Sequence, residues 1–228
     1  MTQLEATGRE LAETLKRYSA DYIEARLEES QSSHLTYRGR DLESVGRTTA
    51  IGGNVRALVR GAWGFVSFND FNGLPGQIEL AVKQARFAGS RKSQLARVEP
   101  VVDNVPAGAD NNPVTIPLAD KKRLLDEYND IIWRTPKIQT SVIGYVDSHK
   151  KVIFLNSSGS YIEQERSDIT LRLSAVATED DQVQQAGFSL GSRGDFGAIQ
   201  GVHRQVEKVA KHAVELLSAP QVKGCLLY

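Results

Sequence analysis

The sequence predicts an α+β protein built from two subdomains, each an antiparallel sheet with flanking helices. Apolar residues at helical spacing begin and end each subdomain, and segments in which apolar and polar residues alternate lie between them. This order occurs in residues 1–96 and again in residues 117–219. The 228 residues of the chain suffice for two domains of about 100 residues each.

Two helices are expected in the first subdomain. Thr2 and Glu5 have the T-x-x-E spacing of a capping box, which satisfies the free amides at a helix start. Apolar residues follow at helical spacing, so residues 3–18 are expected to form an amphipathic helix. The same spacing returns between Leu74 and Ala88 and predicts the second helix.

Strands are expected between these helices. Alternation of apolar and polar residues predicts them at 22–27, 34–37, 42–50 and 55–59. Residues 63–68 then run back along the last of these strands, because the intervening Arg60-Gly61-Ala62 places a glycine at the reversal, which is the hairpin signal. In such a hairpin Trp63 and Phe65 are expected to fill a core, while Arg56 and Arg60 form its solvated face.

Residues 97–116 break the pattern and are interpreted as an inter-domain connection. Four of the seven prolines lie there or at its rim: Pro100, Pro106, Pro113 and Pro117. Gly108, Asn111 and Asn112 add turn-forming residues. This composition is typical of the link between two domains.

The second subdomain repeats the order of the first. Apolar residues between Leu124 and Ile132 predict a helix that ends before Pro136. Alternation predicts strands at 141–146, 152–155, 163–177 and 183–190. The first two of these flank a polar turn at residues 147–151, and a last helix is expected from Ala198 to Leu217.

Composition narrows the classes of function. Lys and Arg together number 28, as do Asp and Glu, so the net charge is zero and favours neither a nucleic-acid nor a membrane partner. The amino terminus lacks the apolar core of a signal peptide, and no run reaches the roughly 18 apolar residues of a membrane span. Cys225 is the single cysteine, which excludes a disulfide within the chain and fits a reducing compartment. We therefore expect a cytoplasmic location.

The histidines do not predict a metal site. The four are His34, His149, His203 and His212. Two histidines on a helix share a metal when they are four or five positions apart, because both rings then lie on one face. His203 and His212 are nine residues apart, a spacing that turns them to opposite faces of a helix.

Two short patterns raise the alternative of a serine enzyme. Ser189 lies in Gly187-Phe188-Ser189-Leu190-Gly191, which matches the G-x-S-x-G elbow of hydrolases. That elbow needs a strand that turns directly into a helix, whereas a loop is expected after Gly191, so a strand end is favoured. Ser148 and Lys151 match S-x-x-K, but they fall in the expected polar turn rather than on a helix.

Three segments carry a resemblance to a known family. Residues 52–68 are similar to a G-x-x-V-R strand followed by a G-x-W/F-G-F/Y turn. Residues 153–159 contain a V-x-x-x-N-S-x-G-like element, and residues 217–224 resemble an L-x-A-x-x-V-K-x-G junction. In this order the segments resemble the amino-terminal half of the TldD/PmbA family of zinc metallopeptidases.

The resemblance implies a framework rather than a catalytic centre. The family binds zinc through an H-E-x-x-x-H helix in its carboxy-terminal half, so no catalytic or metal-binding residue is assigned here and zinc is expected only in that half. Residues 220–228 are expected to begin the missing catalytic domain, with Val222 to Tyr228 as the start of a strand. The resemblance further implies a homo- or heterodimer with a related TldD/PmbA-type subunit and peptide or unfolded polypeptide substrates, including precursors in peptide maturation.

Two alternatives stay open. In the first, the chain would be a stand-alone scaffold or binding protein that pairs with an intact paralogue. In the second, it would be a serine hydrolase that uses Ser189.

Overall fold

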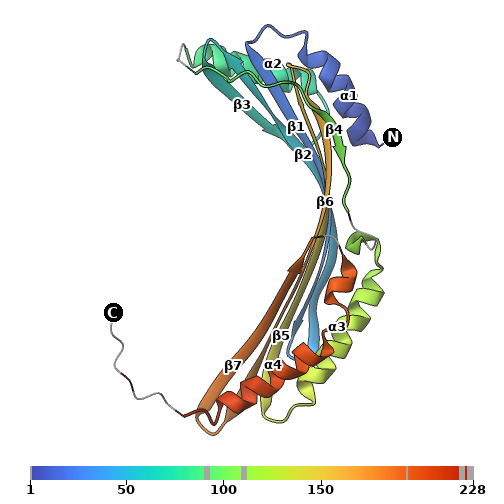
Figure 1. Cartoon of the computed structure of the whole chain (residues 1–228), viewed down its shortest axis with the longest axis vertical. Coiled ribbons are helices and arrows are strands. Elements are labelled where there is room, and N and C mark those ends of the chain that lie inside the picture. Colours follow the sequence, from blue (N-terminus) through green and yellow to red (C-terminus); the bar gives the residue numbers. More distant parts are fainter. Residues whose placement is uncertain (1, 90–92, 109–111, 194, 221–223, 225–228) are drawn as a thin grey trace. The chain divides into compact units, whose positions relative to one another are not determined.

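The protein is described by a computed structural model that covers residues 2–89, 93–108, 112–193, 195–220 and 224. Its helices are α1 (Gln3–Leu15), α2 (Leu74–Phe87), α3 (Leu118–Trp133) and α4 (His203–Leu216), with short 3-10 turns η1 (Pro113–Thr115) and η2 (Phe196–Ile199) (Figure 1). The strands are β1 (Tyr22–Arg38), β2 (Asp41–Val59), β3 (Ala62–Phe68), β4 (Val102–Val105), β5 (Ile138–Asn156), β6 (Tyr161–Glu179) and β7 (Gln182–Ser192). None of the helices among these residues is long and apolar enough to cross a membrane.

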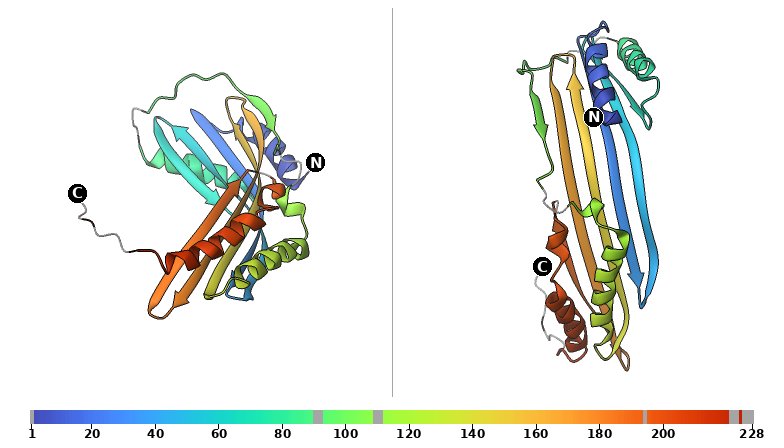
Figure 2. Two further views of the ribbon diagram at one scale, coloured as in Figure 1. Left: turned by 60° about the horizontal axis from the view of Figure 1, so that its bottom comes forward. Right: turned by 90° about the vertical axis from the view of Figure 1, so that its right-hand side faces the viewer.

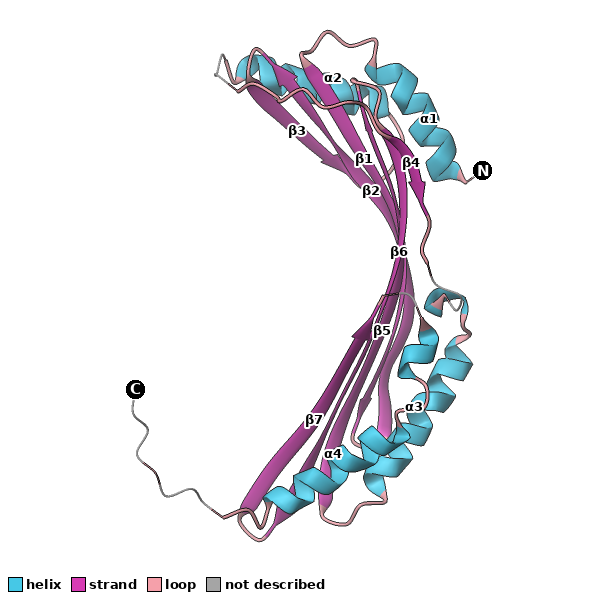
Figure 3. Ribbon diagram, viewed as in Figure 1, coloured by secondary structure: helices cyan, strands magenta, loops and turns pink. Residues whose placement is uncertain are grey.

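The predicted α+β class is confirmed, with a mostly antiparallel sheet and flanking helices (Figure 3). The strand order is β3-β2-β1-β5-β6-β4, and β7 also pairs with β6. The β2–β3 and β6–β7 pairs are antiparallel, whereas β4 is parallel to β6. The segment expected to be only a connection, residues 97–116, therefore supplies a strand as well as η1.

Contacts group the residues into two compact units. The first comprises Met1–Gln31, Thr48–Gly108 and His149–Arg166, and the second comprises Ser32–Arg47, Ala109–Ser148 and Ser167–Tyr228. Since β1, β2, β5 and β6 each contribute residues to both units, the units interleave along the chain. The subdomains expected at residues 1–96 and 117–219 are consecutive in sequence, whereas these contact-based units are not.

In the first unit, α1 and α2 bury their apolar stripes against one face of the strands. The capping box is confirmed, because Thr2 Oγ1 accepts from the Glu5 amide at 3.3 Å and Glu5 Oε2 accepts from the Thr2 amide at 2.9 Å. The core combines both helices with alternate strand residues, chiefly Leu4, Leu11, Leu15, Ile23, Ala25, Leu27, Val55, Ala57, Ile78, Ala81, Ala85, Ile153 and Leu155. Burial on this scale is the main stabilising contribution to a small domain.

In the second unit, α3 and α4 lie next to each other over the strands (Figure 2). Their core includes Leu35, Tyr37, Leu125, Tyr128, Ile132, Ile143, Tyr145, Ile169, Leu171, Leu173, Val206, Ala210 and Ala213. The last helix begins at His203 rather than at the expected Ala198. Gly201 adopts a left-handed φ of 72° just before it, which separates the helix from the preceding 3-10 turn.

The turn predicted at residues 147–151 is wrong. Residues 138–156 form the single strand β5, and the predicted strands at 141–146 and 152–155 are parts of it. The polar run favours a turn when each side chain is judged alone, because a lone charged group is costly to bury. The structure instead buries Asp147 completely and gives it partners from other elements, so that the strand continues. The strands expected at 22–27 and 34–37 likewise merge into β1.

The predicted hairpin is confirmed, and each of its glycines has a distinct reason. Arg60 and Gly61 have φ values of 50° and 75°, as a two-residue turn with two left-handed positions requires. Gly64, opposite Ala57 in β2, lies under α2. A Cβ atom there would lie inside the van der Waals contact distance of the Ala81 carbonyl oxygen and 2.7 Å from the Ala85 amide nitrogen. Only glycine therefore allows α2 to approach β3 this closely.

We predict that Gly64→Ala destabilises the protein by about 2 kcal/mol or more, because α2 must move away from β3 and open its core contacts. Gly76→Ala is the matched control, since Gly76 lies in α2 and a methyl group added there would meet no other part of the protein within 4 Å. That change is expected to raise the free energy of unfolding by about 0.5–1 kcal/mol through helix propensity. Urea denaturation measures both, and equal effects of the two substitutions would contradict the packing argument.

Candidate functional site

Three of the four histidines lie beside different carboxylates, and His34 lies on β1. His203 Nε2 is 3.1 Å from Glu127 Oε2, and the ring packs edge-on against Tyr128. His212 Nδ1 is 3.6 Å from Glu215 on the same exposed helix surface, and His149 is 4.0 Å from Glu165. Within the residues that the structure describes, no group of three or more His, Cys, Asp or Glu side chains is arranged to hold a metal ion.

The two serine patterns are placed on strands. Ser189 lies within β7, exposed and opposite Arg172 of β6, and the strand continues to Ser192. It therefore has no adjoining helix of the kind that a nucleophile elbow requires. Ser148 and Lys151 lie on β5 rather than in a turn. Lys151 Nζ is 2.5 Å from Glu5 and 3.2 Å from Glu165, and hydrogen bonds to these carboxylates raise the pKa of Lys151 to about 12 against the opposing effect of burial.

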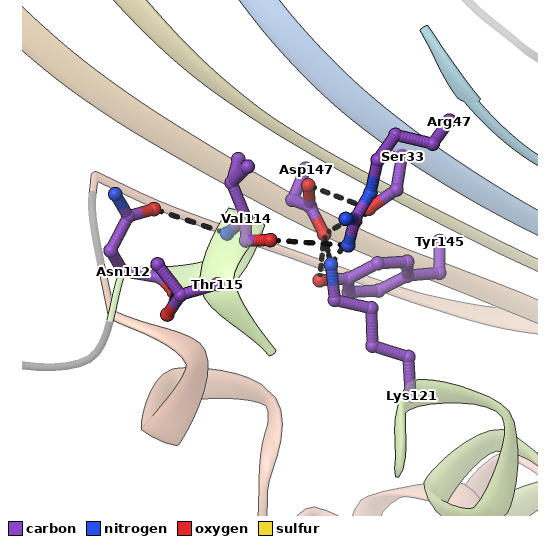
Figure 4. A network of polar contacts seen from close by, with 8 residues as sticks. All are labelled: Ser33, Arg47, Asn112, Val114, Thr115, Lys121, Tyr145 and Asp147. Carbon is purple, nitrogen blue, oxygen red and sulfur yellow. Dashed lines mark hydrogen bonds and ion pairs between the residues drawn. The ribbon is translucent and has the colours of Figure 1, made fainter. Parts of the chain in front are cut away.

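A polar network not predicted from the sequence lies inside the second unit (Figure 4). Lys121 of α3 points its ammonium at Asp147 of β5, with Nζ 2.5 Å from Oδ2 and 2.7 Å from Ser33 Oγ. The hydroxyls of Ser33 and Tyr145 donate to the same carboxylate, at 2.7 Å and 2.5 Å. Both charged side chains have no exposed surface. The carboxylate therefore accepts three hydrogen bonds away from solvent.

The network superficially resembles a serine nucleophile beside a lysine base. Its hydrogen bonds have the wrong direction for that chemistry, because Lys121 donates to Ser33 and Ser33 donates to Asp147. Burial lowers the pKa of Lys121, although Asp147 acts in the opposite direction. Ser33 itself is only 1% exposed, so no substrate reaches it. The arrangement can hold α3 against β1 and β5, but it does not present a nucleophile.

A sequence signal for this network did exist. Lys121 begins the buried stripe of α3 that continues through Leu125, Tyr128 and Ile132. Asp147 likewise continues the buried alternation of β5. A charged residue at an apolar position in each of two elements indicates a buried pair. The neighbouring Arg47 donates to the Val114 carbonyl oxygen at 3.2 Å and so attaches η1 beside it (Figure 4).

The first unit contains an open cleft of about 750 Å³ on the strand face opposite its buried core. Trp63 of β3 is one of its lining residues. The Arg56 guanidinium lies 4.9 Å from the Trp63 ring and pairs with Glu24 at 2.6 Å, while the Tyr22 ring meets Trp63 edge-on at 6.1 Å. Burial raises the pKa of Tyr22, and so does Glu24, which accepts a hydrogen bond from the Tyr22 hydroxyl. The pKa is about 12, so this phenol is neutral at physiological pH.

The cleft corrects two expectations from the sequence. Trp63 is only half-buried and Phe65 is 53% exposed, so neither fills the core. Alternation explains the difference, because Ala62, Gly64 and Val66 occupy the buried face of β3 and leave the opposite face to the aromatic residues. Arg56 is not simply solvated, since it stacks on Trp63 and pairs with Glu24.

Comparison with known proteins identifies the family. Residues 23–88 match the sequence model described as PmbA/TldA metallopeptidase domain 1, and residues 111–218 match the PmbA/TldA metallopeptidase central domain. The chain belongs to the TldD/PmbA metallopeptidase family. The resemblance predicted from the hairpin and from the second half is thereby confirmed.

Curated relatives carry metalloprotease names and are longer. Metalloprotease slr0863 of Synechocystis sp. is 36% identical over 220 residues, which cover 94% of this chain and 47% of that protein. A metalloprotease of Methanothermobacter thermautotrophicus is 28% identical over 204 residues, covering 87% and 44% respectively. The chain thus spans about half the length of the curated relatives it matches.

Solved structures show the same fold at low sequence identity. TldE from Thermococcus kodakarensis aligns with a TM-score of 0.70 at 14% identity, over 91% of this chain and 47% of that one. A Thermotoga maritima protein proposed as a modulator of a DNA gyrase aligns with a TM-score of 0.76, also at 14% identity, over 96% and 49%. The strand expected at Val222 to Tyr228 falls outside the described residues except for residue 224. Cys225 is therefore also outside them.

We predict that Lys121→Met lowers the free energy of unfolding by about 3–5 kcal/mol, because it leaves Asp147 charged, buried and without its cation. The double variant Lys121→Met with Asp147→Leu is expected to lose less, since no lone charge remains. Lys122→Met is the control at the next residue, where an exposed pair with Asp126 contributes about 0.5 kcal/mol. Chemical denaturation tests all three, and a Lys121→Met loss as small as that of Lys122→Met would refute the assignment.

Ser189→Ala is expected to leave the rate of ester hydrolysis by the purified chain unchanged, because Ser189 lies within a strand ladder. A chromogenic acetyl ester gives the readout, and circular dichroism checks the fold. A nucleophile would carry a factor of about a hundred or more. A loss of that size with the fold intact would restore the serine-hydrolase alternative.

Proposed function

We propose that this chain supplies the non-catalytic framework of a TldD/PmbA-type zinc metallopeptidase that cleaves or matures peptides and unfolded polypeptides. The single observation that carries the proposal is the match to metallopeptidase domain 1 and then to the central domain, at residues 23–88 and 111–218. The relatives named metalloproteases support it, as they contain a region of similar size in addition to the part matched here.

Zinc does not fit the residues described here, because these offer no ligand group for it. We assign the metal and the carboxylate that activates water to the region that the relatives carry in addition. The present chain then contributes rigid sheet, contacts to a related subunit and part of the wall that limits substrate access. The proposed setting is the cytoplasm, and the proposed assembly is a homo- or heterodimer.

Complementation with a relative tests this proposal. The chain is mixed with the part of the Synechocystis relative that it does not match, produced as a separate polypeptide. We expect no zinc to survive dialysis of this chain alone, and no chelator-sensitive cleavage of an unstructured fluorogenic peptide. The mixture is expected to cleave the peptide, and a chelator is expected to abolish cleavage. Stoichiometric zinc in the chain alone, measured by elemental analysis, would overturn the assignment.

The alternative of a stand-alone scaffold makes a different prediction in the same experiment. A scaffold that pairs with an intact paralogue would co-elute with the full-length Synechocystis relative in size-exclusion chromatography and alter its cleavage rate, but it would not complement the isolated part. The two outcomes separate a catalytic framework from a regulatory partner.

A further inference from the structure

The cleft around Trp63 has walls of two kinds. One is the strand face that carries Tyr22, Arg56, Trp63 and Phe154. The other is the segment 95–101, which leads towards β4 (Figure 1). It contributes Leu95, Val98 and Val101. We call this feature the aromatic cleft. All of its lining residues belong to the first unit.

Several polar groups of the aromatic cleft are already engaged by other residues of the first unit. Glu24 accepts from both Arg56 and Tyr22, and the Asp21 carboxylate accepts from the Arg60 amide at 2.6 Å. Asn156 Oδ1 accepts from the amides of residues 158 and 160 at 3.0 Å and 2.9 Å. A polar ligand would have to displace these bonds, whereas an apolar ligand would leave them intact.

Much of the free surface of the aromatic cleft is apolar or planar, although Arg97 and Glu99 of segment 95–101 also line it. Leu95 is 44% exposed, Val98 is 78% exposed and Val101 is 46% exposed. Arg56 keeps 47% of its side chain exposed while its guanidinium carbon lies over the Trp63 ring and Glu24 pairs with its charge. The exposed part of this side chain can accept an aromatic ring, which guanidinium groups attract by stacking and cation–π interaction.

The volume of the aromatic cleft is large enough to admit a side chain on an extended chain. About 750 Å³ exceeds the volume of any single side chain and leaves room for the backbone on either side of it. The cleft is also open to solvent. Segment 95–101 is attached at its end, where the Val101 amide donates to Ser160 Oγ at 3.2 Å and the Val101 carbonyl accepts from the Tyr161 amide at 2.8 Å.

We propose that the aromatic cleft binds an aromatic side chain of an unfolded polypeptide, stacked on Arg56 and packed against Trp63 and Val98. This inference deepens the proposed function, on which it rests for the class of ligand. It adds an anchoring surface formed entirely by the described residues of this chain and a preference for aromatic over small or charged side chains.

The two tryptophans of the sequence provide a built-in measurement. Trp63 lies in the aromatic cleft, whereas Trp133 belongs to the second unit and donates its indole hydrogen to Gly39 and Ser141. Each gives one indole signal in a nitrogen–proton correlation spectrum. The probe is the blocked peptide acetyl-Gly-Gly-Phe-Gly-Gly-amide, and the comparison peptides carry Ala or Asp in place of Phe.

The Phe peptide is expected to shift the Trp63 signal saturably, with a millimolar dissociation constant, and to leave Trp133 unmoved. The Ala and Asp peptides are expected to cause no saturable shift up to about ten times that concentration. Arg56→Gln is expected to weaken binding of the Phe peptide at least fivefold without changing the melting temperature by more than a few degrees. Phe87→Ser is the control, because Phe87 is 94% exposed and does not line the aromatic cleft, and it is expected to bind as the unaltered chain does.

Three results would overturn the proposal: no saturable shift of Trp63, equal shifts of Trp63 and Trp133, or equal binding of the Phe and Ala peptides. Unchanged affinity in Arg56→Gln would refute the stacking on that residue and with it the proposed geometry. This assay needs no zinc and no cleavage. Failure of complementation with intact binding would therefore reject only the metallopeptidase framework, and the reverse result would reject only the aromatic cleft.

Discussion

The structure depends above all on the two-residue alternation of its long strands. In β1 the buried positions 23, 25 and 27 of the first unit and 33, 35 and 37 of the second are all odd-numbered, and the buried positions of β5 are odd-numbered apart from Val152. Such regularity gives each unit one strand face for its helices and leaves the other face free. The buried Lys121–Asp147 pair lies on the helix-covered strand face of the second unit. The aromatic cleft lies on the opposite strand face of the first unit.

Local signals explain what the sequence predicted correctly. The capping box at Thr2, the glycine turn at Arg60-Gly61 and the apolar stripes of α2 and α3 all involve residues within a few positions of one another. The polar run in β5 failed because its explanation is not local. Asp147 finds Lys121 at 26 positions and Ser33 at 114 positions in the sequence, and no nearby residue reveals that partnership. Polarity alone predicts a turn at residues 147–151, because polar side chains are usually exposed to solvent. This prediction fails where a buried partner compensates the charge.

The buried pair also limits what can be inferred from chemistry-bearing residues. Ser33, Lys121 and Asp147 approach one another as closely as catalytic groups do, yet all three are sealed from solvent. Replacing such a pair with apolar residues often lowers the free energy of unfolding only slightly. Stability alone is therefore a weak explanation for the presence of the pair. A carboxylate that accepts three well-directed hydrogen bonds, one of them from Lys121, does fix one orientation of α3, because any rotation of the helix would leave an unpaired charge in the core.

The hairpin illustrates how one short segment serves both faces of the sheet. Gly61 allows the chain to reverse, and Gly64 lets α2 settle against β3. Trp63, between them in the sequence, points to the opposite face and supports Arg56 in the aromatic cleft. The spacing G-x-W-G-F therefore combines a turn, a helix contact and a ligand-facing ring within five residues. A sequence pattern of this kind identifies the hairpin from its glycines, but only the packing of α2 decides which face remains for the tryptophan.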